Sequence, residues 1–280
     1  MISLQIMKYK LSISNIAWSE KEDLEIYGLM KNYGFTGLEI APSRIWEKPY
    51  DQKEAETAKF KKFINNQNIE LVAFQSLLFG HPEFAIFQSE DIRIETLNYL
   101  KKNITLAGKL GAKALVFGSP KNRLVGNMPK KEANEIALAF FRELGEFAIE
   151  NKTCFCIEPN PPIYSGDYIL TTQDAIELVK AVNNLGFKLN IDLGTIIANQ
   201  EDLESTLLTA LPYAGHFHIS EPFLEKIEAN EARHKKIKQI LLDYNYDLAI
   251  SIEMKNAGPE ISNISNIEET LKFISNIYHE

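Results

Sequence analysis

Cysteine is almost absent from this 280-residue chain. The two cysteines, Cys154 and Cys156, are separated by one residue, so in a strand both side chains would point to the same face. Two cysteines are too few for the disulfide framework of a small secreted domain, and a zinc site would need further ligands. We expect two reduced, buried side chains in a protein of a reducing compartment.

Long apolar runs are also missing. No stretch approaches the ~20 apolar residues that a membrane-spanning helix needs. The segment Met1–Tyr9 has too little apolar content, and no cleavage-like site, for a secretion signal. These absences predict a cytoplasmic protein that has no membrane partner.

Positive charge is in the minority. The chain has 30 Lys and Arg against 38 Asp and Glu, which gives a formal net charge of −8 and a pI of about 5.3. A protein that binds duplex nucleic acid needs a basic face to release counterions, so this balance argues against a nucleic-acid partner. The first predicted strand is followed by neither a Gly-x-Gly-x-x-Gly nor a Walker loop, which argues against a nucleotide-binding open sheet.

The chain does contain a regular alternation of short apolar strands and longer amphipathic helices. Most of the strands are continuous apolar runs, as expected when both faces of a sheet are covered. Eight strands are predicted, at Lys10–Ala17, Gly37–Ala41, Leu71–Ser76, Ala114–Gly118, Cys154–Pro159, Leu189–Leu193, His216–Ser220 and Ala249–Met254. We therefore predict the α/β class and a (β/α)8 TIM barrel, with a doubly wound open sheet as the alternative. No linker-like segment interrupts the pattern, so residues 1–280 are expected to form a single domain.

Capping residues mark several expected helix starts. Capping boxes begin at Ser19 and Ser265, and other N-cap positions are occupied by Ser89, Thr171 and Asn199.

Four consecutive strands end in side chains of the kind that bind metals, namely Glu158, Asp192, His218 and Glu253. The carboxyl ends of barrel strands meet at one mouth, where barrel active sites lie. Three carboxylates and an imidazole would be costly to bury together unless a cation lies between them. A salt-bridged or capping role explains any one of them, but it is a weaker explanation for all four. The sequence predicts a site for one divalent metal ion.

The ligand set constrains the metal. Three oxygen ligands and one nitrogen ligand, with room for substrate oxygens, suit octahedral Mn2+, Mg2+ or Co2+, and we expect Mn2+. Catalytic zinc usually takes more histidine or cysteine, so Zn2+ is the less favoured alternative.

Six segments carry a resemblance to a known family, and together they span nearly the whole chain. They are Gly34–Ile40, Phe117–Arg123, Ile157–Pro161, Asn190–Gly194, His216–Ile219 and Ser251–Glu253. In their order and spacing the chain resembles the xylose-isomerase-like barrel superfamily, which includes ketose 3-epimerases, hydroxypyruvate isomerase, inosose dehydratase and the family-2 endonucleases.

The resemblance implies roles for the four residues. Those matching Glu158, Asp192, His218 and Glu253 bind the metal in that family, and the two glutamates also act as base and acid on a substrate carbon. The expected function is a metal-dependent sugar or sugar-phosphate isomerase or epimerase that works through an enediolate. Its partner is then a small carbohydrate, and a homo-oligomer is compatible with this reading.

The match fails at three positions where sugar 3-epimerases hold substrate hydroxyls. Thr195 stands in place of a histidine, Leu224 in place of a frequent arginine, and Tyr164 in place of a glutamate. The metal chemistry therefore carries over, whereas the particular substrate does not.

Three alternatives stay open. A dehydratase of the inosose-dehydratase type would eliminate water after the same proton abstraction. A family-2 endonuclease needs a trinuclear zinc cluster built on many histidines, and this chain has only five. A barrel that keeps its ligands could also serve as a non-catalytic binding subunit.

Several polar residues near the predicted mouth are candidate substrate contacts, with packing or surface salt bridges as the alternative roles. They are His81, Asn160, Lys121, Arg123 and Glu221. Arg44, Lys121 and Arg123 suit a phosphate or carboxylate on the substrate. His216 is expected to be an inward-facing or a core histidine, Glu39 has no assigned role, and His234 is expected on a solvated helix face.

Overall fold

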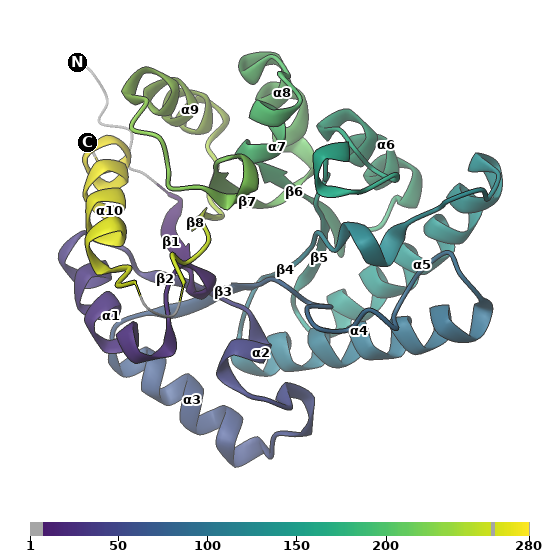
Figure 1. Ribbon diagram of the computed structural model, residues 1–280, viewed down its shortest axis with the longest axis horizontal. Coiled ribbons are helices and arrows are strands. Elements are labelled where there is room, and N and C mark those ends of the chain that lie inside the picture. The colour runs from purple at the N-terminus through teal and green to yellow at the C-terminus, as the bar shows by residue number, and fades with distance from the viewer. Residues whose placement is uncertain (1–7, 259–260, 280) are drawn as a thin grey trace.

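The computed structural model describes residues 8–258 and 261–279, which form a closed barrel of eight parallel strands surrounded by helices (Figure 1). Each strand pairs with the next, and the last pairs back with the first, which confirms the predicted TIM barrel. The strands are β1 (Lys10–Ser14), β2 (Gly37–Ile40), β3 (Glu70–Phe74), β4 (Ala114–Phe117), β5 (Cys154–Ile157), β6 (Phe187–Asp192), β7 (Ala214–Ser220) and β8 (Ala249–Glu253). Residues 1–7, which carry most of the segment tested for a secretion signal, lie outside the described residues.

Helices follow the strands around the barrel. The α-helices are α1 (Asp23–Asn32), α2 (Pro42–Ile45), α3 (Glu54–Asn66), α4 (Glu90–Leu110), α5 (Lys130–Glu150), α6 (Thr172–Val182), α7 (Leu193–Ala198), α8 (Leu203–Ala210), α9 (Glu231–Tyr244) and α10 (Ile264–Tyr278). Short 3-10 turns are η1 (Asn15–Ala17), η2 (Glu20–Glu22), η3 (Pro49–Asp51), η4 (Pro120–Arg123), η5 (Pro162–Tyr164), η6 (Leu211–Tyr213) and η7 (Pro222–Leu224).

The predicted helix starts are confirmed at three positions, which are Ser19, Ser89 and Thr171. Two are wrong. The helix α8 begins after Asp202, whose carboxylate accepts a hydrogen bond from the Ser205 backbone, and Asn199 ends α7 instead. The helix α10 begins after Asn263, so Ser265 lies inside its first turn.

The core has two parts. A large apolar core fills the space between the barrel and the helices. A small cluster of residues from neighbouring strands is separate from it and consists of Val72, Ala73, Ala114 and Cys156, with Cys154 and Ala249 packed against it. Polar residues lie inside the barrel closer to the strands' carboxyl ends, so the interior changes from apolar to polar toward the mouth.

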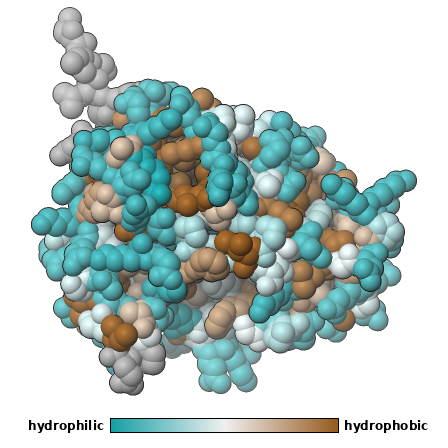
Figure 2. All heavy atoms as spheres, turned by 45° about the horizontal axis from the view of Figure 1, so that its top comes forward, coloured by the Kyte–Doolittle hydropathy of each residue, from teal (hydrophilic) through white to brown (hydrophobic). Residues whose placement is uncertain are grey.

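The outer surface is mostly hydrophilic on the face that can be seen in Figure 2. On the face shown in Figure 2, apolar residues form separate patches within a mostly hydrophilic surface. None of the helices within residues 8–258 and 261–279 is long and apolar enough to cross a membrane.

Candidate metal centre

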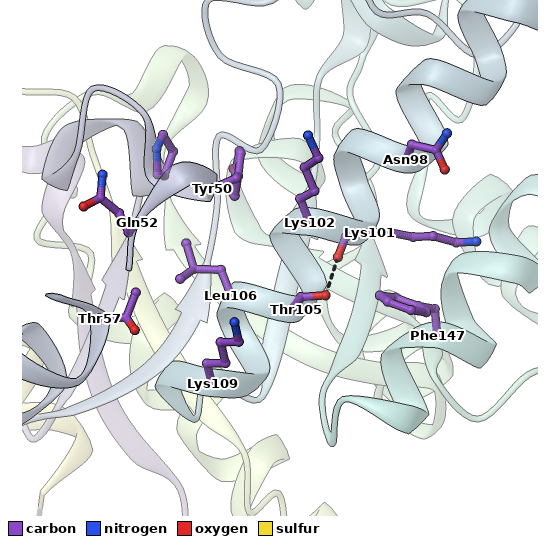
Figure 3. Close-up of a pocket in the computed structure, with 11 residues that line it drawn as sticks. Tyr50, Gln52, Thr57, Asn98, Lys101, Lys102, Thr105, Leu106, Lys109 and Phe147 are labelled. Atoms are coloured by element: carbon purple, nitrogen blue, oxygen red, sulfur yellow. Dashed lines mark hydrogen bonds between the residues drawn. The ribbon is translucent and has the colours of Figure 1, made fainter. Parts of the chain in front are cut away.

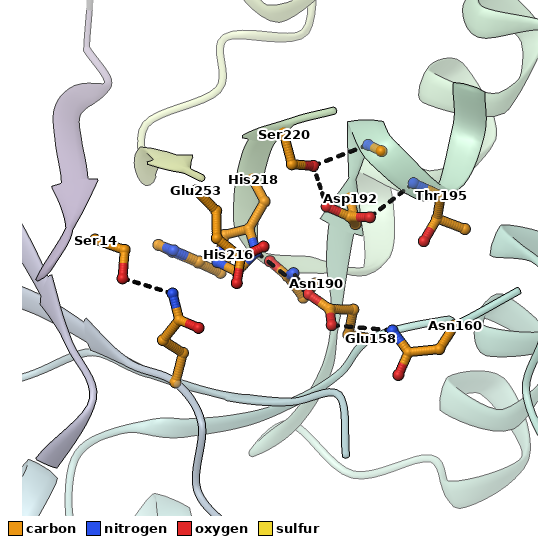
Figure 4. Close-up of polar contacts among 12 residues, drawn as sticks. Ser14, Glu158, Asn160, Asn190, Asp192, Thr195, His216, His218, Ser220 and Glu253 are labelled. Carbon is orange, nitrogen blue, oxygen red and sulfur yellow. Dashed lines mark hydrogen bonds and ion pairs between the residues drawn. The ribbon is translucent and has the colours of Figure 1, made fainter. Parts of the chain in front are cut away.

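The four predicted ligands meet at the mouth of the barrel (Figure 4). Glu158 follows β5, Asp192 and Glu253 are the last residues of β6 and β8, and His218 lies in β7. The strand register places Asp192 beside His218, and Ser220 beside Glu253. One ligand atom from each of the four residues lies within 4.8 Å of all the others, and no residue of the set is more than 9% exposed.

His218 is oriented by a carboxylate beneath it. Its Nε2 lies 3.0 Å from Oε1 of Glu39, and Nε2 of the neighbouring His216 lies 2.8 Å from Oε2 of the same carboxylate. A carboxylate can only accept, so we assign the proton of His218 to Nε2, which leaves the lone pair on Nδ1 directed toward the mouth. A buried carboxylate that fixes the tautomer of a ligand histidine is a common feature of protein metal sites.

The surroundings of the Nδ1 atom of His218 show whether the site fits a cation. It lies 3.1 Å from Oε2 of Glu253 and 3.2 Å from Oε1 of Glu158, yet it is buried without a hydrogen bond of acceptable geometry. A nitrogen lone pair and two carboxylate oxygens are thus aimed at one small volume. Atoms that only accept are stable together when a cation lies between them, so the donor set fits a divalent metal ion.

The electrostatics of the cluster agree with this fit. Burial, together with the nearby Glu158 and Asp192, raises the pKa of Glu253 to about 7 against the opposing effect of His218. Burial and the charge of Glu158 likewise raise the pKa of Asp192. Burial also acts to raise the pKa of Glu158, but its contacts with His218 outweigh this and lower it. Despite burial, Glu39 and Glu253 hold the pKa of His218 well above its usual range, so the carboxylates around this residue favour a positive charge at its position. A divalent metal ion bound by the same residues would supply that charge.

Neighbouring groups hold the carboxylates in place. The amide of Asn190 donates to Oε1 of Glu158 at 2.8 Å, and that of Asn160 donates to Oε2 at 3.2 Å. The backbone N–H of Thr195 donates to Asp192 at 2.7 Å, so Asp192 also caps α7. Ser220 donates its hydroxyl to the other oxygen of Asp192. Glu158 and Asp192 therefore keep free lone pairs while these hydrogen bonds orient their carboxylates.

Comparison with known proteins identifies the family to which the chain belongs. The model of the xylose isomerase-like TIM barrel family matches residues 28–277, most of the chain. The chain belongs to that family. No curated protein sequence matches it significantly.

Solved structures share the fold of this family member at low sequence identity. D-psicose 3-epimerase from Clostridium cellulolyticum H10, with D-tagatose, has a TM-score of 0.78 and 17% identity, with coverage of 96% of this chain and 99% of that one. An AP endonuclease, family 2, from Brucella melitensis has a TM-score of 0.74 and 18% identity, covering 95% and 98%. The IOLI protein with a binding zinc atom has a TM-score of 0.71 and 18% identity, covering 96% and 98%. At this identity the likeness shows the fold alone.

Glu39 is the part of the centre to which sequence reasoning gave no role. It is fully buried inside the barrel, where the two histidines of β7 hold its pKa well below the usual range against the effect of burial. His216, expected as an inward or a core histidine, points inward and bonds to it. The only signal in the sequence was a charged residue within an apolar strand, because its partners come from a strand far along the chain.

Arg123, in η4, is a buried residue. It is 0% exposed, and its guanidinium donates to the carbonyls of Glu158, at 2.8 Å, and Phe117, at 3.4 Å, and to the side chain of Asn160, at 3.0 Å. Burial lowers its pKa to about 10, so the group stays charged at neutral pH. The guanidinium ties β4 and β5 together below the surface, and the expected contact between Arg123 and a charged substrate stays a prediction.

The other predicted substrate contacts have different surroundings. His81 bonds through both ring nitrogens, to Glu83 at 2.8 Å and to the Tyr99 hydroxyl at 2.7 Å. Glu221 is paired with Arg233 of α9, and Lys121 is exposed. Asn160 contacts Glu158, so the structure gives it a positioning contact within the centre. The four metal-type residues therefore converge more closely than the predicted substrate contacts do.

His234 was expected on a solvated helix face, and this is wrong. The side chain is 0% exposed, and its Nδ1 lies 3.2 Å from the Tyr278 hydroxyl of α10. The basic run around it suggested a surface, but the last helix of the chain covers this face of α9.

An aromatic pair that sequence reasoning did not identify lies close to the carboxylates. The Tyr164 hydroxyl accepts a hydrogen bond from the Phe223 backbone at 2.9 Å, and the two rings meet edge to face at 5.5 Å. Phe223 and Leu224 both have left-handed φ angles, 62° and 55°, a strained conformation for these residue types. Burial raises the pKa of Tyr164, and the charges of Asp192, Glu158 and Glu253 raise it further. The pair joins the loops that follow β5 and β7, on the mouth side of the barrel.

A separate groove lies on the outside of the barrel (Figure 3). Residues of η3 and α4 line it, including Tyr50, Lys102 and Lys109, and Lys101 at its edge pairs with Glu143 of α5. Because helix surfaces and not strand ends form this groove, it is distinct from the candidate metal centre.

Proposed function

We propose that the chain is a metal-dependent isomerase or epimerase that moves a proton on a carbon next to the carbonyl of a small sugar. The observation that carries this is the pair Glu158 and Glu253, whose carboxylates approach Nδ1 of His218 from different strands, at 3.2 and 3.1 Å. A reaction that removes a proton from one face of a carbon and returns one to the other needs two such groups. A divalent cation held by Glu158, Asp192, His218 and Glu253 would supply Lewis-acid stabilisation of the enediolate, commonly worth several kcal/mol.

The roles of the two glutamates follow from their surroundings. Glu158 has the lowered pKa and receives two amide hydrogen bonds, which suits a carboxylate that accepts the substrate proton. Glu253 has a pKa of about 7, close to the value at which a group both gives and takes protons at neutral pH. We assign Glu158 as base and Glu253 as acid in one direction, with the roles exchanged in the other.

The charge of the mouth favours a neutral sugar over a sugar phosphate. The arginines near it are engaged: Arg44 pairs with Asp23, Arg233 pairs with Glu221, and Arg123 is buried. The rings of Tyr164 and Phe223, on the loops that follow β5 and β7, suit the C–H face of a sugar ring. The D-psicose 3-epimerase with D-tagatose, a structural neighbour, supports the same substrate class.

Two other activities are less well supported. A dehydratase would share the first proton abstraction, and its product would be lighter than the substrate by one water. The endonuclease neighbour shares the fold, but the acidic net charge and Thr195, which stands in place of a histidine, argue against that activity here.

Metal content is the first test. Protein purified without a chelator should contain about one divalent ion per chain, Mn2+ by expectation, with Mg2+, Co2+ or Zn2+ as alternatives. Elemental analysis measures this, with Asp192→Asn as the variant that should lose the ion while remaining folded. Full activity in a protein without metal would exclude the proposal.

Proton exchange is the second test. A panel of neutral ketoses incubated in deuterium oxide should gain solvent deuterium at the carbon next to the carbonyl. Glu158→Gln and Glu253→Gln should each slow turnover by roughly 100-fold or more, because an amide cannot carry the proton. Glu225→Gln, an exposed glutamate paired with Lys255, is the matched control and should be unaffected. Complete retention of the original hydrogen would instead indicate a hydride shift.

A further inference from the structure

The two cysteines lie together in β5, as its first and third residues, and Glu158 directly follows the strand. Their sulfur atoms are 3.5 Å apart, and both thiols are free. Cys156 is buried, whereas Cys154 is only partly buried. The proposed function uses neither of them.

A glycine of a nearby strand leaves space for the two sulfur atoms. Gly215 of β7 lies against both sulfurs, since a Cβ atom at that position would come within 2.6 Å of Cys156 Sγ and 2.9 Å of Cys154 Sγ. Lys188, which pairs with Cys156 across β5 and β6, adds a positive charge beside them. The hydrogen bond from Cys156, which outweighs the effect of burial, lowers the pKa of Cys154. Cys154 is the less buried of the two and is therefore the one that an oxidant reaches first, and the sulfur of Cys156 is already in contact with it.

We propose that Cys154 and Cys156 form an oxidation site, in which a peroxide converts the two thiols into an intramolecular disulfide that weakens metal binding at the mouth. The second half of this statement rests on the proposed function, whereas the first does not.

The chemistry balances in two steps. The Cys154 thiolate attacks one oxygen of hydrogen peroxide, so an S–O bond forms, the O–O bond breaks and hydroxide leaves, taking up a proton as water. The Cys156 sulfur then attacks the Cys154 sulfur, so the S–S bond forms, the S–O bond breaks and a second water leaves with the Cys156 proton. Two thiols and one peroxide give one disulfide and two waters.

The link to the metal centre is the strand itself (β5 in Figure 1). Residues i and i+2 of a strand are about 6.4–6.8 Å apart at Cα, the upper end of the range for a disulfide. Closing the bond must draw these two residues together, and Glu158 follows Cys156 by only two positions. Because the strand is strained by the bond, we expect dithiothreitol to reverse the reaction readily.

The experiment treats the whole protein with hydrogen peroxide and counts thiols and mass. Since the chain has only two cysteines, the expected result is unambiguous: both thiols disappear, the mass falls by about 2 Da, the protein stays monomeric on a non-reducing gel, and dithiothreitol restores it. Two free thiols after treatment, stable oxygen adducts on Cys154, or a disulfide-linked dimer would each overturn the proposal.

Two matched variants test the assigned roles. In Cys156→Ser, the Cys154 sulfenic acid should persist and be trapped by dimedone, whereas in Cys154→Ser the remaining thiol should survive the same exposure. Equal reactivity of the two variants would contradict the roles.

Manganese titration of the reduced and the oxidised protein tests the coupling. The oxidised form should bind about tenfold more weakly or worse, and Cys154→Ser should show no change on peroxide treatment. Equal affinities in the wild type would disprove the coupling while leaving the oxidation site intact. If the reduced protein binds no metal at all, the proposed function fails and the thiol and mass results still decide the disulfide.

Discussion

Glu39 shows how one buried side chain determines the state of a metal ligand. Its carboxylate accepts from Nε2 of both His216 and His218, and it has no exposure to solvent. The charge is costly to bury, and the two imidazoles offset that cost. Removing the charge should therefore act on the metal centre through His218, although Glu39 is not itself one of the four ligands.

We predict that Glu39→Gln weakens Mn2+ binding by about 10- to 100-fold, the range typical of groups that orient a ligand histidine. The amide can still accept one hydrogen bond, but it no longer favours the Nε2–H tautomer of His218 by charge. Calorimetric titration of the chelator-treated protein measures the effect. Glu70→Gln, at an exposed glutamate paired with Lys10, is the control. Wild-type affinity in Glu39→Gln would show that His218 is oriented without its carboxylate.

The sequence was informative at the residue scale where a charged side chain ends an apolar strand. Glu158, Asp192, His218 and Glu253 could be found in this way because barrel topology gathers the ends of strands. Glu39 could not be assigned, because its role appears only once the closed barrel brings β2 opposite β7. The burial of Arg123 could not be predicted either. Its neighbour Lys121 is exposed, whereas Arg123 contacts main-chain carbonyls, which no sequence pattern reveals.

At the scale of elements, a buried side chain holds together the carboxyl ends of two neighbouring strands and the loops that follow them. Arg123 in η4 contacts the last residue of β4 and the Glu158–Asn160 segment that follows β5. The Ile169 carbonyl of the next loop accepts from the Asn160 backbone at 3.0 Å. The guanidinium therefore joins two strand ends and one loop around the Glu158 carboxylate.

We predict that Arg123→Ala destabilises the protein by about 3 kcal/mol, because several buried carbonyls and the Asn160 side chain lose a charged donor. A shift in the midpoint of urea unfolding measures this. Lys121→Ala, on the same turn but exposed, should change stability by no more than about 0.5 kcal/mol. Activity should fall equally for a sugar and for its phosphate, so a loss confined to the phosphate would restore the anion-binding role.

Element boundaries were predicted less well than element order. All eight strands were found, but β1 ends at Ser14, where η1 follows, instead of running to Ala17. Capping was predicted where the side chain bonds within its own turn, as at Thr171. It failed at Asn199 and Ser265, since Asp202 and Asn263 nearby are equally plausible caps and tertiary packing decides between them. The side chains near a helix start therefore limit the possible N-cap residues to a few, but they do not decide which one is used.

At the scale of the molecule, closure of the barrel joins the two ends of the chain. The helix α10 packs against both α1 and α9, and the Tyr9 hydroxyl donates to the Tyr278 carbonyl at 3.0 Å. The alternation of strands and helices predicted this closure, but not which side chains are buried by it. The single-domain boundary of 1–280 and homo-oligomer formation stay predictions.

His234 makes this closure sensitive to pH. It is enclosed between α9 and α10, where its Nδ1 meets the Tyr278 hydroxyl, and burial, together with the charge of Arg233, lowers its pKa from 6.5 to about 4. In the unfolded chain the imidazole takes up a proton near pH 6.5, whereas in the folded chain it does so only near pH 4. Between these values the unfolded state binds more protons, so stability is complete above pH 6.5 and is lost as the pH falls toward 4.

We predict that this one residue removes about 3 kcal/mol of stability between pH 6.5 and 4, since each pKa unit corresponds to about 1.4 kcal/mol. In His234→Phe the imidazole is absent, so the free energy of unfolding from urea titrations should fall less steeply over that range than in the wild type. Subtracting the two curves removes the contribution of the carboxylates at the mouth, which titrate in both proteins. Leu241→Ala, buried on the same helix, should lower stability by a similar amount at every pH and leave the slope unchanged. Parallel curves for the wild type and His234→Phe would show that His234 gains its proton as easily in the folded chain as in the unfolded one.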